Sequence, residues 1–321
     1  MAAPKEDWFS MTKRWRGVSG VAVLAAVCLV ADVAGAVETA SAPSGGVQIA
    51  AHRALYTMSL AHSKTDSGVT GAQGEMGYQW GETCDGWTVE QRYQLTINYA
   101  ESQDVAIDSN FVTWESKDGL SYRFNQKETR NGTVDEEIRG SAQLDGPGKG
   151  GTVTFEKPQP QTMKLPPGAL FPSAHTILLI EKAKAGEDFV ARQVFDGATV
   201  EGAVLVSAVI GKKVEPSPAA QSDPKADPKS AADVKGAGDP NAGGKSAASA
   251  DPSLNDPVLQ RPGWRIRLAF FPSDPNTETP DYELGMLLLD NGISRDMTID
   301  YGDYTISAKL AKIESLGKPH C

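Results

Sequence analysis

The sequence has little cysteine and little histidine, and it has no excess of basic residues. Its 321 residues include 3 cysteines and 4 histidines, and the formal net charge is −10. Non-specific nucleic-acid binding needs clustered Lys and Arg to displace counterions, so the acidic balance predicts no nucleic-acid partner. No two histidines stand at metal-ligand spacing and no Cys-x-x-Cys pair occurs, so we expect no metal and no cofactor.

A phosphate-binding loop and a second long apolar run are also missing. The glycine-rich stretch at 148–151 lacks the Lys-Ser/Thr pair and the helix of such a loop, so we interpret it as a turn. After residue 36 no apolar segment reaches the roughly 20 residues of a membrane-spanning helix. We therefore expect a protein that is peripheral to a membrane at most.

The marked apolar run lies at the N-terminus and has the layout of an export signal. A basic region at 13–16 precedes an apolar stretch at 18–33, and Ala34-Gly35-Ala36 then supplies small residues around a cleavage point. This order predicts a Sec-type signal peptide over residues 1–36, cleaved after Ala36, and a periplasmic protein. The alternative is an uncleaved anchor helix, which the short run and Asp32 disfavour.

Removal of the signal peptide leaves two cysteines, Cys84 and Cys321. They are the only pair available for an intramolecular disulfide in an oxidising compartment. Closing so long a loop stabilises the fold by roughly 5 kcal/mol in the chain-entropy model. The alternatives are two free thiols or a two-cysteine metal site, and thiols tend to oxidise outside the cytosol.

Short strand-like runs separated by turns dominate the chain after a polar lead at 37–50. From Trp87 to Ile97, apolar and polar side chains alternate strictly, which is typical of an antiparallel sheet with one solvated face. Asx-Gly pairs that tolerate positive φ mark the turns between such runs; they are Asp85-Gly86, Asp118-Gly119, Asn131-Gly132, Asp196-Gly197 and Asn291-Gly292. The pattern predicts an all-β fold, a long meander of about a dozen strands.

Two segments interrupt the strands. After the proline-rich stretch from Leu165 to Pro172, we expect one amphipathic helix that is capped by Ser173, ends at Gly186 and buries Ile177 against the concave face of the sheet. From about 214 to 262 the chain is rich in Pro, Ala, Asp and Lys and has no aromatic residue until Trp264, which predicts disorder. This segment is either a linker between domains or an insertion in one hairpin; we favour one domain over residues 51–321.

Aromatic side chains on the predicted strands are candidates for a groove that binds a lipid or a peptide. They are Tyr78, Trp80, Trp87, Tyr93, Trp114, Tyr122 and Phe124, with Ile177 from the helix. Binding grooves are concave and mostly apolar. The alternative is that these aromatics simply fill the core.

Catalytic candidates are few. His175 follows Ser173 at the start of the predicted helix, but Ser-x-His is no nucleophile elbow, so we interpret His175 as a packed or capping residue. Acidic residues near the C-terminus raise the alternative of a hydrolase; they are Asp281, Glu283, Asp296, Asp300 and Asp303. We expect acidic residues on the solvated face of strands and no catalytic residue.

Several separate blocks of the chain resemble the EipB-like cell-envelope integrity proteins, an alphaproteobacterial periplasmic family long known only as a domain of unknown function. The blocks are Ala51–Tyr56, Met76–Trp80, Cys84–Trp87, Leu165–Thr176, Pro280–Leu284, Asn291–Asp296 and Asp300–Tyr304. The resemblance implies a single antiparallel β-spiral, an open barrel-like sheet with one inserted helix, and a disulfide that falls here on Cys84 and Cys321. It also implies a role in resistance to envelope stress, without assigned catalytic residues.

Together, these observations predict a non-enzymatic periplasmic protein that maintains envelope integrity by binding a lipid, a lipoprotein or a peptidoglycan-associated partner. A hydrolase of envelope polymers and a periplasmic lipid carrier are the alternatives. The hypothesis of a lipid carrier rests only on the similarity of the predicted fold to that of lipoprotein carriers.

Overall fold

The computed structural model describes residues 46–216, 251–272 and 277–321. The predicted signal peptide, most of the predicted lead and residues 217–250 of the predicted insertion lie outside these ranges. Within them, no helix combines the length and the apolar character needed to cross a membrane.

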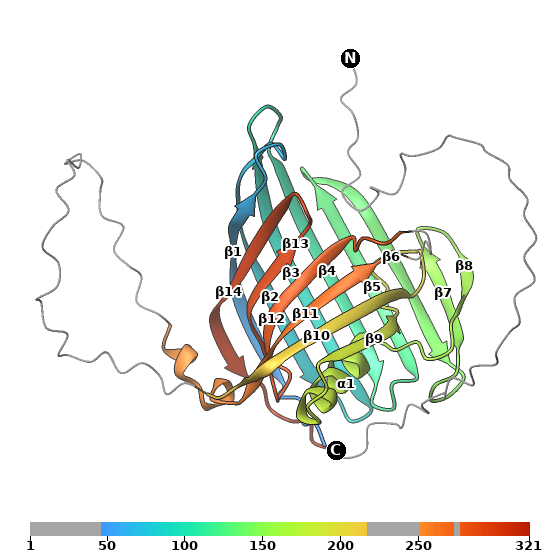
Figure 1. The fold of residues 1–321 in the computed structure, drawn as a ribbon. Coiled ribbons are helices and arrows are strands. Elements are labelled where there is room, and N and C mark those ends of the chain that lie inside the picture. Colours follow the sequence, from blue (N-terminus) through green and yellow to red (C-terminus); the bar gives the residue numbers. More distant parts are fainter. Residues whose placement is uncertain (1–45, 217–250, 273–276) are drawn as a thin grey trace, which may run out of the picture. The chain divides into compact units, whose positions relative to one another are not determined.

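The described residues form one antiparallel sheet of 14 strands. The first meander consists of β1 (His52–Ser63), β2 (Val69–Glu82), β3 (Gly86–Tyr99), β4 (Val105–Ser116), β5 (Ser121–Arg130), β6 (Thr133–Leu144), β7 (Gly151–Lys157) and β8 (Gln161–Leu165). The second meander consists of β9 (Phe189–Val194), β10 (Val204–Val214), β11 (Gly263–Phe271), β12 (Tyr282–Leu289), β13 (Ser294–Asp300) and β14 (Tyr304–Ser315). Within each meander every strand pairs with the next along the chain (Figure 1), which confirms the predicted antiparallel architecture.

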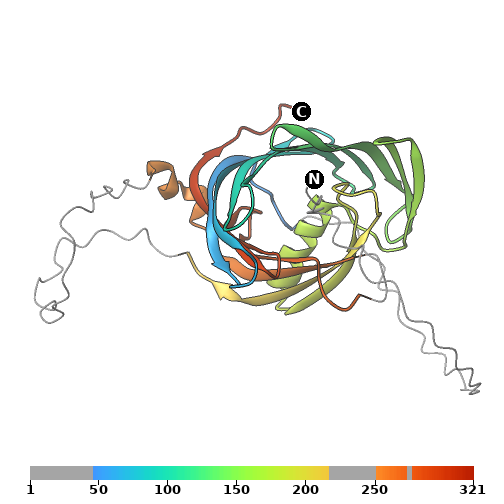
Figure 2. The same ribbon diagram turned by 90° about the horizontal axis from the view of Figure 1, so that it is seen from above.

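A pairing between β1 and β14 joins the two meanders. It runs from His52 opposite Ser315 to Ser63 opposite Tyr304, while the other side of β1 pairs with β2. Strands β8 and β9 are the two edge strands of the sheet. Seen from above, the sheet curls round helix α1 (Pro172–Lys184), which lies on its concave side (Figure 2).

The Asx-Gly turns follow the prediction at the β5–β6 hairpin but not at the start of β3. Asn131 and Gly132 have φ values of 51° and 77°, as a tight two-residue hairpin turn requires. Gly86 has no positive φ; a Cβ there would lie 2.4 Å from the carbonyl oxygen of Glu115 and 2.6 Å from Nε1 of Trp114. The predicted reason is therefore wrong for Gly86, which is glycine because β4 packs too closely for a side chain.

Helix α1 begins two residues earlier than predicted. Its N-cap is Phe171, whose own side chain makes no capping hydrogen bond, so the prediction that Ser173 caps the helix is wrong. Pro172 suits the first helical position because that position has no intrahelical use for an N–H. At the other end the chain leaves the helix at Gly186, which has a φ of 82° and confirms the predicted stop.

The segment before β11 is folded, although the predicted disorder extended to residue 262. Two short 3-10 turns lie there, η1 (Pro252–Asn255) and η2 (Pro257–Leu259). Asp251 and Asp256 precede the prolines, and each accepts a backbone N–H, at 2.9 and 2.8 Å. Thus the Asp-Pro pairs in this segment cap short turns. Because β10 pairs directly with β11, the sequence between them is an insertion in one hairpin.

Cys84 and Cys321 form a disulfide, with their Cα atoms 5.7 Å apart. Cys84 lies in the turn between β2 and β3, and Cys321 follows β14, so the bond fastens the chain where the seam of β1 and β14 ends. This confirms the predicted pairing and excludes the alternatives of free thiols or a two-cysteine metal site.

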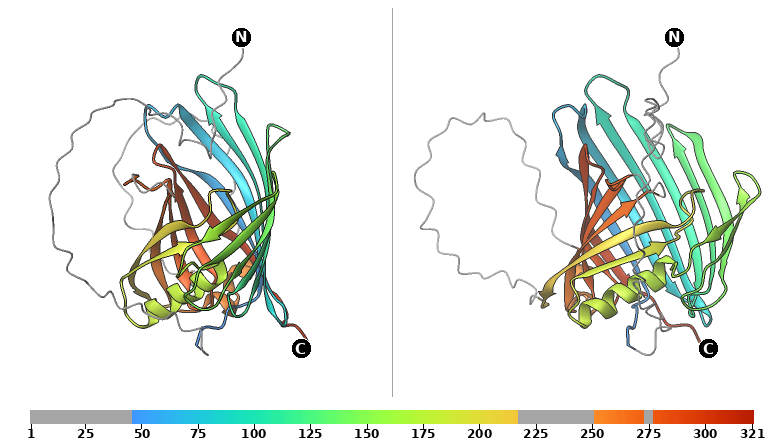
Figure 3. Two further views of the ribbon diagram at one scale, coloured as in Figure 1. Left: turned by 90° about the vertical axis from the view of Figure 1, so that its right-hand side faces the viewer. Right: turned by 45° about the vertical axis from the view of Figure 1, so that its right-hand side comes forward.

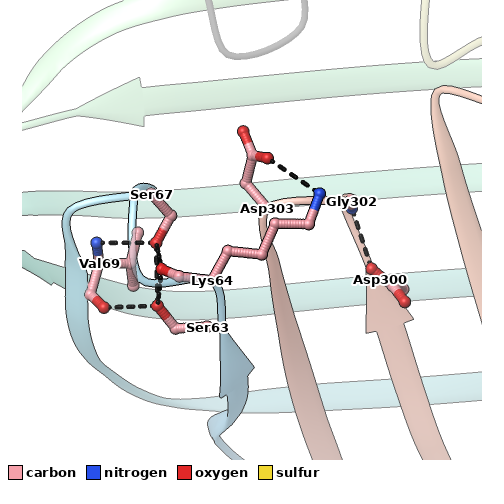
Figure 4. A network of polar contacts seen from close by, with 7 residues as sticks. All are labelled: Ser63, Lys64, Ser67, Val69, Asp300, Gly302 and Asp303. Atoms are coloured by element: carbon pink, nitrogen blue, oxygen red, sulfur yellow. Dashed lines mark hydrogen bonds and ion pairs between the residues drawn. The ribbon is translucent and has the colours of Figure 1, made fainter.

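The other end of the same seam is fastened by polar contacts (Figure 4). The backbone N–H of Lys64 donates to the carbonyl oxygen of Asp303 at 2.9 Å, and Lys64 Nζ lies 3.5 Å from Oδ1 of Asp303. Ser63 Oγ donates to the Val69 carbonyl at 2.7 Å and holds the turn between β1 and β2 in shape. Both ends of the long-range seam are therefore tied to neighbouring turns.

Candidate functional site

Alternation along the paired strands gives the sheet two faces. Tyr56 on β1 lies opposite Met76 on β2, and Met76 lies opposite Tyr93 on β3. Tyr56 and Met76 are buried, whereas their chain neighbours Thr57 and Glu75 are exposed. We call the face with Tyr56 the inner face; α1 lies on it.

One end of the inner face is filled by α1 (Figure 3). Ile177 and Ile180 are buried in one apolar cluster with Trp80 of the first meander and Ile266 of the second. Helix α1 therefore packs against strands of both meanders. This is the burial that the sequence predicts for Ile177 against the sheet.

A carboxylate from β4 holds the N-terminus of α1. The backbone N–H groups of Ser173 and Ala174 donate to Oε2 and Oε1 of Glu115, each at 2.7 Å. They are among the N–H groups that a helix leaves without internal partners, and the negative charge lies at the positive end of the helix dipole. Glu115 is 2% exposed, and burial raises its pKa to about 7, against the lowering effect of the two hydrogen bonds.

His175 lies inside this filled end. It is buried, and its Nε2 atom has no hydrogen-bond partner in the described part of the chain. Burial, together with the positive charge of Arg192, lowers the pKa of His175 to about 4, so the imidazole is neutral at pH 7. This environment is that of a packed histidine.

A second buried cluster is mainly aromatic. Its rings are Tyr122, Phe124, Phe155, Phe171 and Phe195, and we call it the aromatic cluster. Phe171 stacks on Tyr122 at 4.9 Å between ring centroids, and the Tyr122 hydroxyl donates to the carbonyl of Asp196 at 2.7 Å. The groove candidates Tyr122 and Phe124 thus lie in packed core.

Other aromatic side chains of the inner face remain partly exposed. We call this set the inner aromatic surface: Tyr78, Tyr93, Phe111, Phe270, Tyr282 and Tyr301. The rings of Phe270 and Tyr282 stack at 4.3 Å, and Tyr301 lies 6.2 Å from Tyr282. Burial is also the main cause that raises the pKa of Tyr78, Tyr282 and Tyr301. Each of the three residues nevertheless keeps some solvent-accessible area. Side chains that protein surrounds and solvent still reaches are typical of a concave lining.

Acidic side chains border the inner aromatic surface on β5 and β6. The Tyr93 hydroxyl donates to Glu128 Oε2 at 3.1 Å, and Glu136 lies directly opposite Glu128. Arg130 Nη2 is 3.7 Å from Glu128 Oε1. Burial, followed by the negative charges of Glu128 and Asp135, raises the pKa of Glu136 to about 7.

The remaining groove candidates lie apart from this surface. Trp80 is buried at the α1 end, and the half-buried Trp87 meets it edge to face at 6.3 Å. Trp114 is on the outer face, where the guanidinium of Arg123 covers its ring at 4.7 Å. Of the aromatics singled out from the sequence, Tyr78 and Tyr93 belong to the inner aromatic surface.

The acidic residues of the hydrolase alternative do not converge with His175. Glu283 and Asp300 lie opposite each other on the outer face, where Glu283 pairs with Arg267 at 2.9 Å and Asp300 accepts the N–H of Gly302. The remaining three, Asp281, Asp296 and Asp303, are exposed.

Sequence reasoning missed Glu115, Glu128, Glu136 and the second-meander half of the inner aromatic surface. Phe270, Tyr282 and Tyr301 join the same sheet as Tyr78 and Tyr93 only because β14 pairs with β1. Glu115 was detectable as the one charged residue among the inner-facing positions of its strand, which alternate as Ile107, Ser109, Phe111, Thr113 and Glu115.

Comparison with known proteins gives consistent matches. A family model described as EipB-like matches residues 43–237 and 236–317. The chain is 30% identical over 304 residues to the cell envelope integrity protein EipB of Brucella abortus (strain 2308), over 94% of this chain and 95% of that protein. A crystal structure described as a beta-barrel-like protein of domain of unknown function DUF1849 from Brucella abortus has a TM-score of 0.68 and 27% sequence identity, and the match covers 85% of this chain and 100% of that one.

Proposed function

This chain belongs to the EipB-like family, and from that premise we propose that it maintains the integrity of the cell envelope as a non-enzymatic periplasmic binding protein. Its inner aromatic surface binds the apolar part of an envelope component, a lipid or a lipoprotein. The similar protein of Brucella abortus bears the name cell envelope integrity protein, which supports the first part of this proposal.

The observation that carries the binding function is the partial exposure of aromatic side chains on the inner face. Besides the aromatics, the apolar residues Met297 and Ile299 of β13 keep accessible area. Ligand sites for apolar molecules have this composition, an apolar concave wall with few polar groups. A face that served only as core would have these side chains fully covered, as those of the aromatic cluster are.

Two features support a periplasmic location. The Cys84–Cys321 disulfide is a bond that persists in oxidising compartments. The N-terminal residues 1–36 have the order of a signal peptide.

A binding role rather than catalysis is supported by how the polar groups are used. His175 is packed inside the α1 end, and Glu283 is engaged in an ion pair on the outer face. Within the described ranges, no three His, Cys, Asp or Glu side chains are grouped so that they could hold a metal ion.

Filling the inner aromatic surface tests the proposal. Gln91 lies between Tyr78 and Phe111 in the register of the inner face, and Gln94 on the same strand is exposed on the outer face. We expect Gln91→Trp to abolish rescue of a gene-deletion strain under detergent stress, because the indole occupies the space of the ligand. The matched variant Gln94→Trp is expected to rescue like the wild type.

Both variants are checked for thermal unfolding and for secretion. Full rescue by Gln91→Trp, with a melting temperature equal to that of Gln94→Trp, contradicts a binding role for this surface. Loss of rescue by both variants would show that the effect does not depend on the inner face.

A further inference from the structure

We propose that the inner aromatic surface contains, at its β5–β6 end, a site for a protonated primary amine. The ligand is then an amphiphile with an apolar body and an ammonium head. This inference rests on the proposed function, because it names the head group of the ligand that the inner aromatic surface binds.

The first support is an excess of negative charge on the inner face of this hairpin. Glu128 and Glu136 are direct cross-strand neighbours, and Asp135 is next in the chain. Arg130 is the basic side chain paired there, 3.7 Å from Glu128 and 3.3 Å from Asp135. One guanidinium leaves a net negative site, and directly opposed like charges destabilise a strand pair. A bound cation relieves this repulsion.

The second support is independent of charge. Gln126 precedes Glu128 by two residues on β5, so both side chains project from the inner face. Gln126 is 4% exposed, and its Oε1 atom has no hydrogen-bond partner in the described part of the chain. A buried acceptor without a donor destabilises the folded state. The ligand that satisfies it must donate a hydrogen bond.

Aromatic rings complete the site from both meanders. Tyr93 on β3 donates its hydroxyl hydrogen to Glu128. Tyr301 comes from the turn after β13 in the other meander; burial and, after it, the negative charge of Glu128 raise the pKa of Tyr301. The faces of aromatic rings attract cations.

A primary ammonium fits these groups better than other cations. It offers three N–H donors, which matches the acceptors Gln126 Oε1, Glu128 and Glu136. A quaternary ammonium has no N–H and leaves Gln126 unsatisfied. The apolar body then extends along Phe270 and Tyr282, which continue the inner aromatic surface away from the carboxylates.

Calorimetric titration of the full mature protein with octylammonium, octyltrimethylammonium and octyl glucoside tests the inference. We expect octylammonium to bind about tenfold more tightly than the other two compounds. A tenfold difference in affinity corresponds to about one charge-assisted hydrogen bond. Glu136→Gln and Gln126→Leu are each expected to weaken octylammonium binding about tenfold and to leave octyl glucoside unchanged. Glu137→Gln is the matched control, because Glu137 faces outward and pairs with Lys157 at 2.9 Å.

Each outcome separates this inference from the proposed function. Equal binding of the three compounds, unchanged in the variants, overturns the amine site and leaves the apolar surface standing. No binding of any of them counts against both. If Glu136→Gln does not fold, Gln126→Leu decides, because it removes only the uncharged acceptor.

Discussion

The two ends of the inner face are built by the same strands but differ in burial. At one end, α1 and the aromatic cluster leave almost no accessible area; Ile180, Phe171 and Phe195 are each 0% exposed. At the other end, Tyr93, Tyr282 and Tyr301 keep accessible area although protein surrounds them. The same alternating pattern therefore yields fully buried core or a partly exposed surface according to whether a distant segment covers it.

This contrast predicts different costs for similar substitutions. Truncation in the filled end removes packing that stabilises the fold, and leaves a cavity. Truncation on the inner aromatic surface removes less packing and acts mainly on ligand binding. Two predictions compare matched residues in the two regions, and a third compares two tyrosines of the inner aromatic surface.

The largest effect is expected from a pair of phenylalanines. Phe195→Ala leaves a cavity among the rings of the aromatic cluster and is expected to cost about 4 kcal/mol of unfolding free energy. Phe270→Ala, on the partly exposed surface, is expected to cost roughly half as much. Urea denaturation of both variants measures the difference; equal losses would mean that Phe270 is as fully packed as Phe195.

The next prediction concerns two carboxyl groups with the same shifted pKa. Glu115 and Glu136 both have a pKa raised to about 7 from 4.5, chiefly because of burial. A raised carboxyl pKa means that the folded state holds the proton more tightly. The stability that this supplies is present below pH 4.5 and is lost as the pH rises through 7.

Unfolding free energies across this pH range therefore distinguish the two. As the pH rises from 4.5 to 7, ionisation of Glu115 is expected to lower the unfolding free energy of the wild type by on the order of 3 kcal/mol, because Glu115 is almost completely buried. Glu115→Gln is expected not to show this decrease. For Glu136 the corresponding decrease in unfolding free energy is expected to be smaller, since water reaches Glu136 and screens its charge. The same dependence of unfolding free energy on pH in wild type and Glu115→Gln would contradict the burial of Glu115 at the N-terminus of α1.

The smallest effect is expected from removing one hydroxyl. Tyr93→Phe deletes the hydrogen bond to Glu128 and is expected to cost about 1.5 kcal/mol, the lower value for a bond to a charged group. Tyr78→Phe is the control, because Tyr78 makes no such contact with a carboxylate, and its cost is expected to be near zero. Thermal unfolding of both proteins tests this; equal values would show that the Tyr93 bond contributes nothing.

The parts of the fold that could be predicted depend on local signals. The alternation from Trp87 to Ile97 specifies a strand, and the Asn131-Gly132 pair specifies a hairpin turn. Both signals lie within a few residues of the chain, so the meander could be predicted. The disulfide could be predicted because only Cys84 and Cys321 follow the predicted signal peptide. The pairing of β1 with β14 has no local signal, since it joins strands more than 200 residues apart in the sequence.

The candidate site was less predictable for the same reason. The first N–H groups of α1 donate to Glu115, which lies 58 residues before Ser173 in the chain, whereas capping rules consider only adjacent residues. Aromatic content alone could not separate Tyr122, which is buried in the aromatic cluster, from Tyr93, which borders the carboxylates. That distinction is made by the position of α1 and by the return of β14.

Native mass spectrometry of protein purified from the periplasm tests the central claim most directly. The account predicts an additional bound mass on the wild type and on Gln94→Trp, and none on Gln91→Trp, because the new indole occupies the inner aromatic surface. The same bound mass on all three proteins, or an unliganded wild type, would contradict the claim that this surface is a binding site.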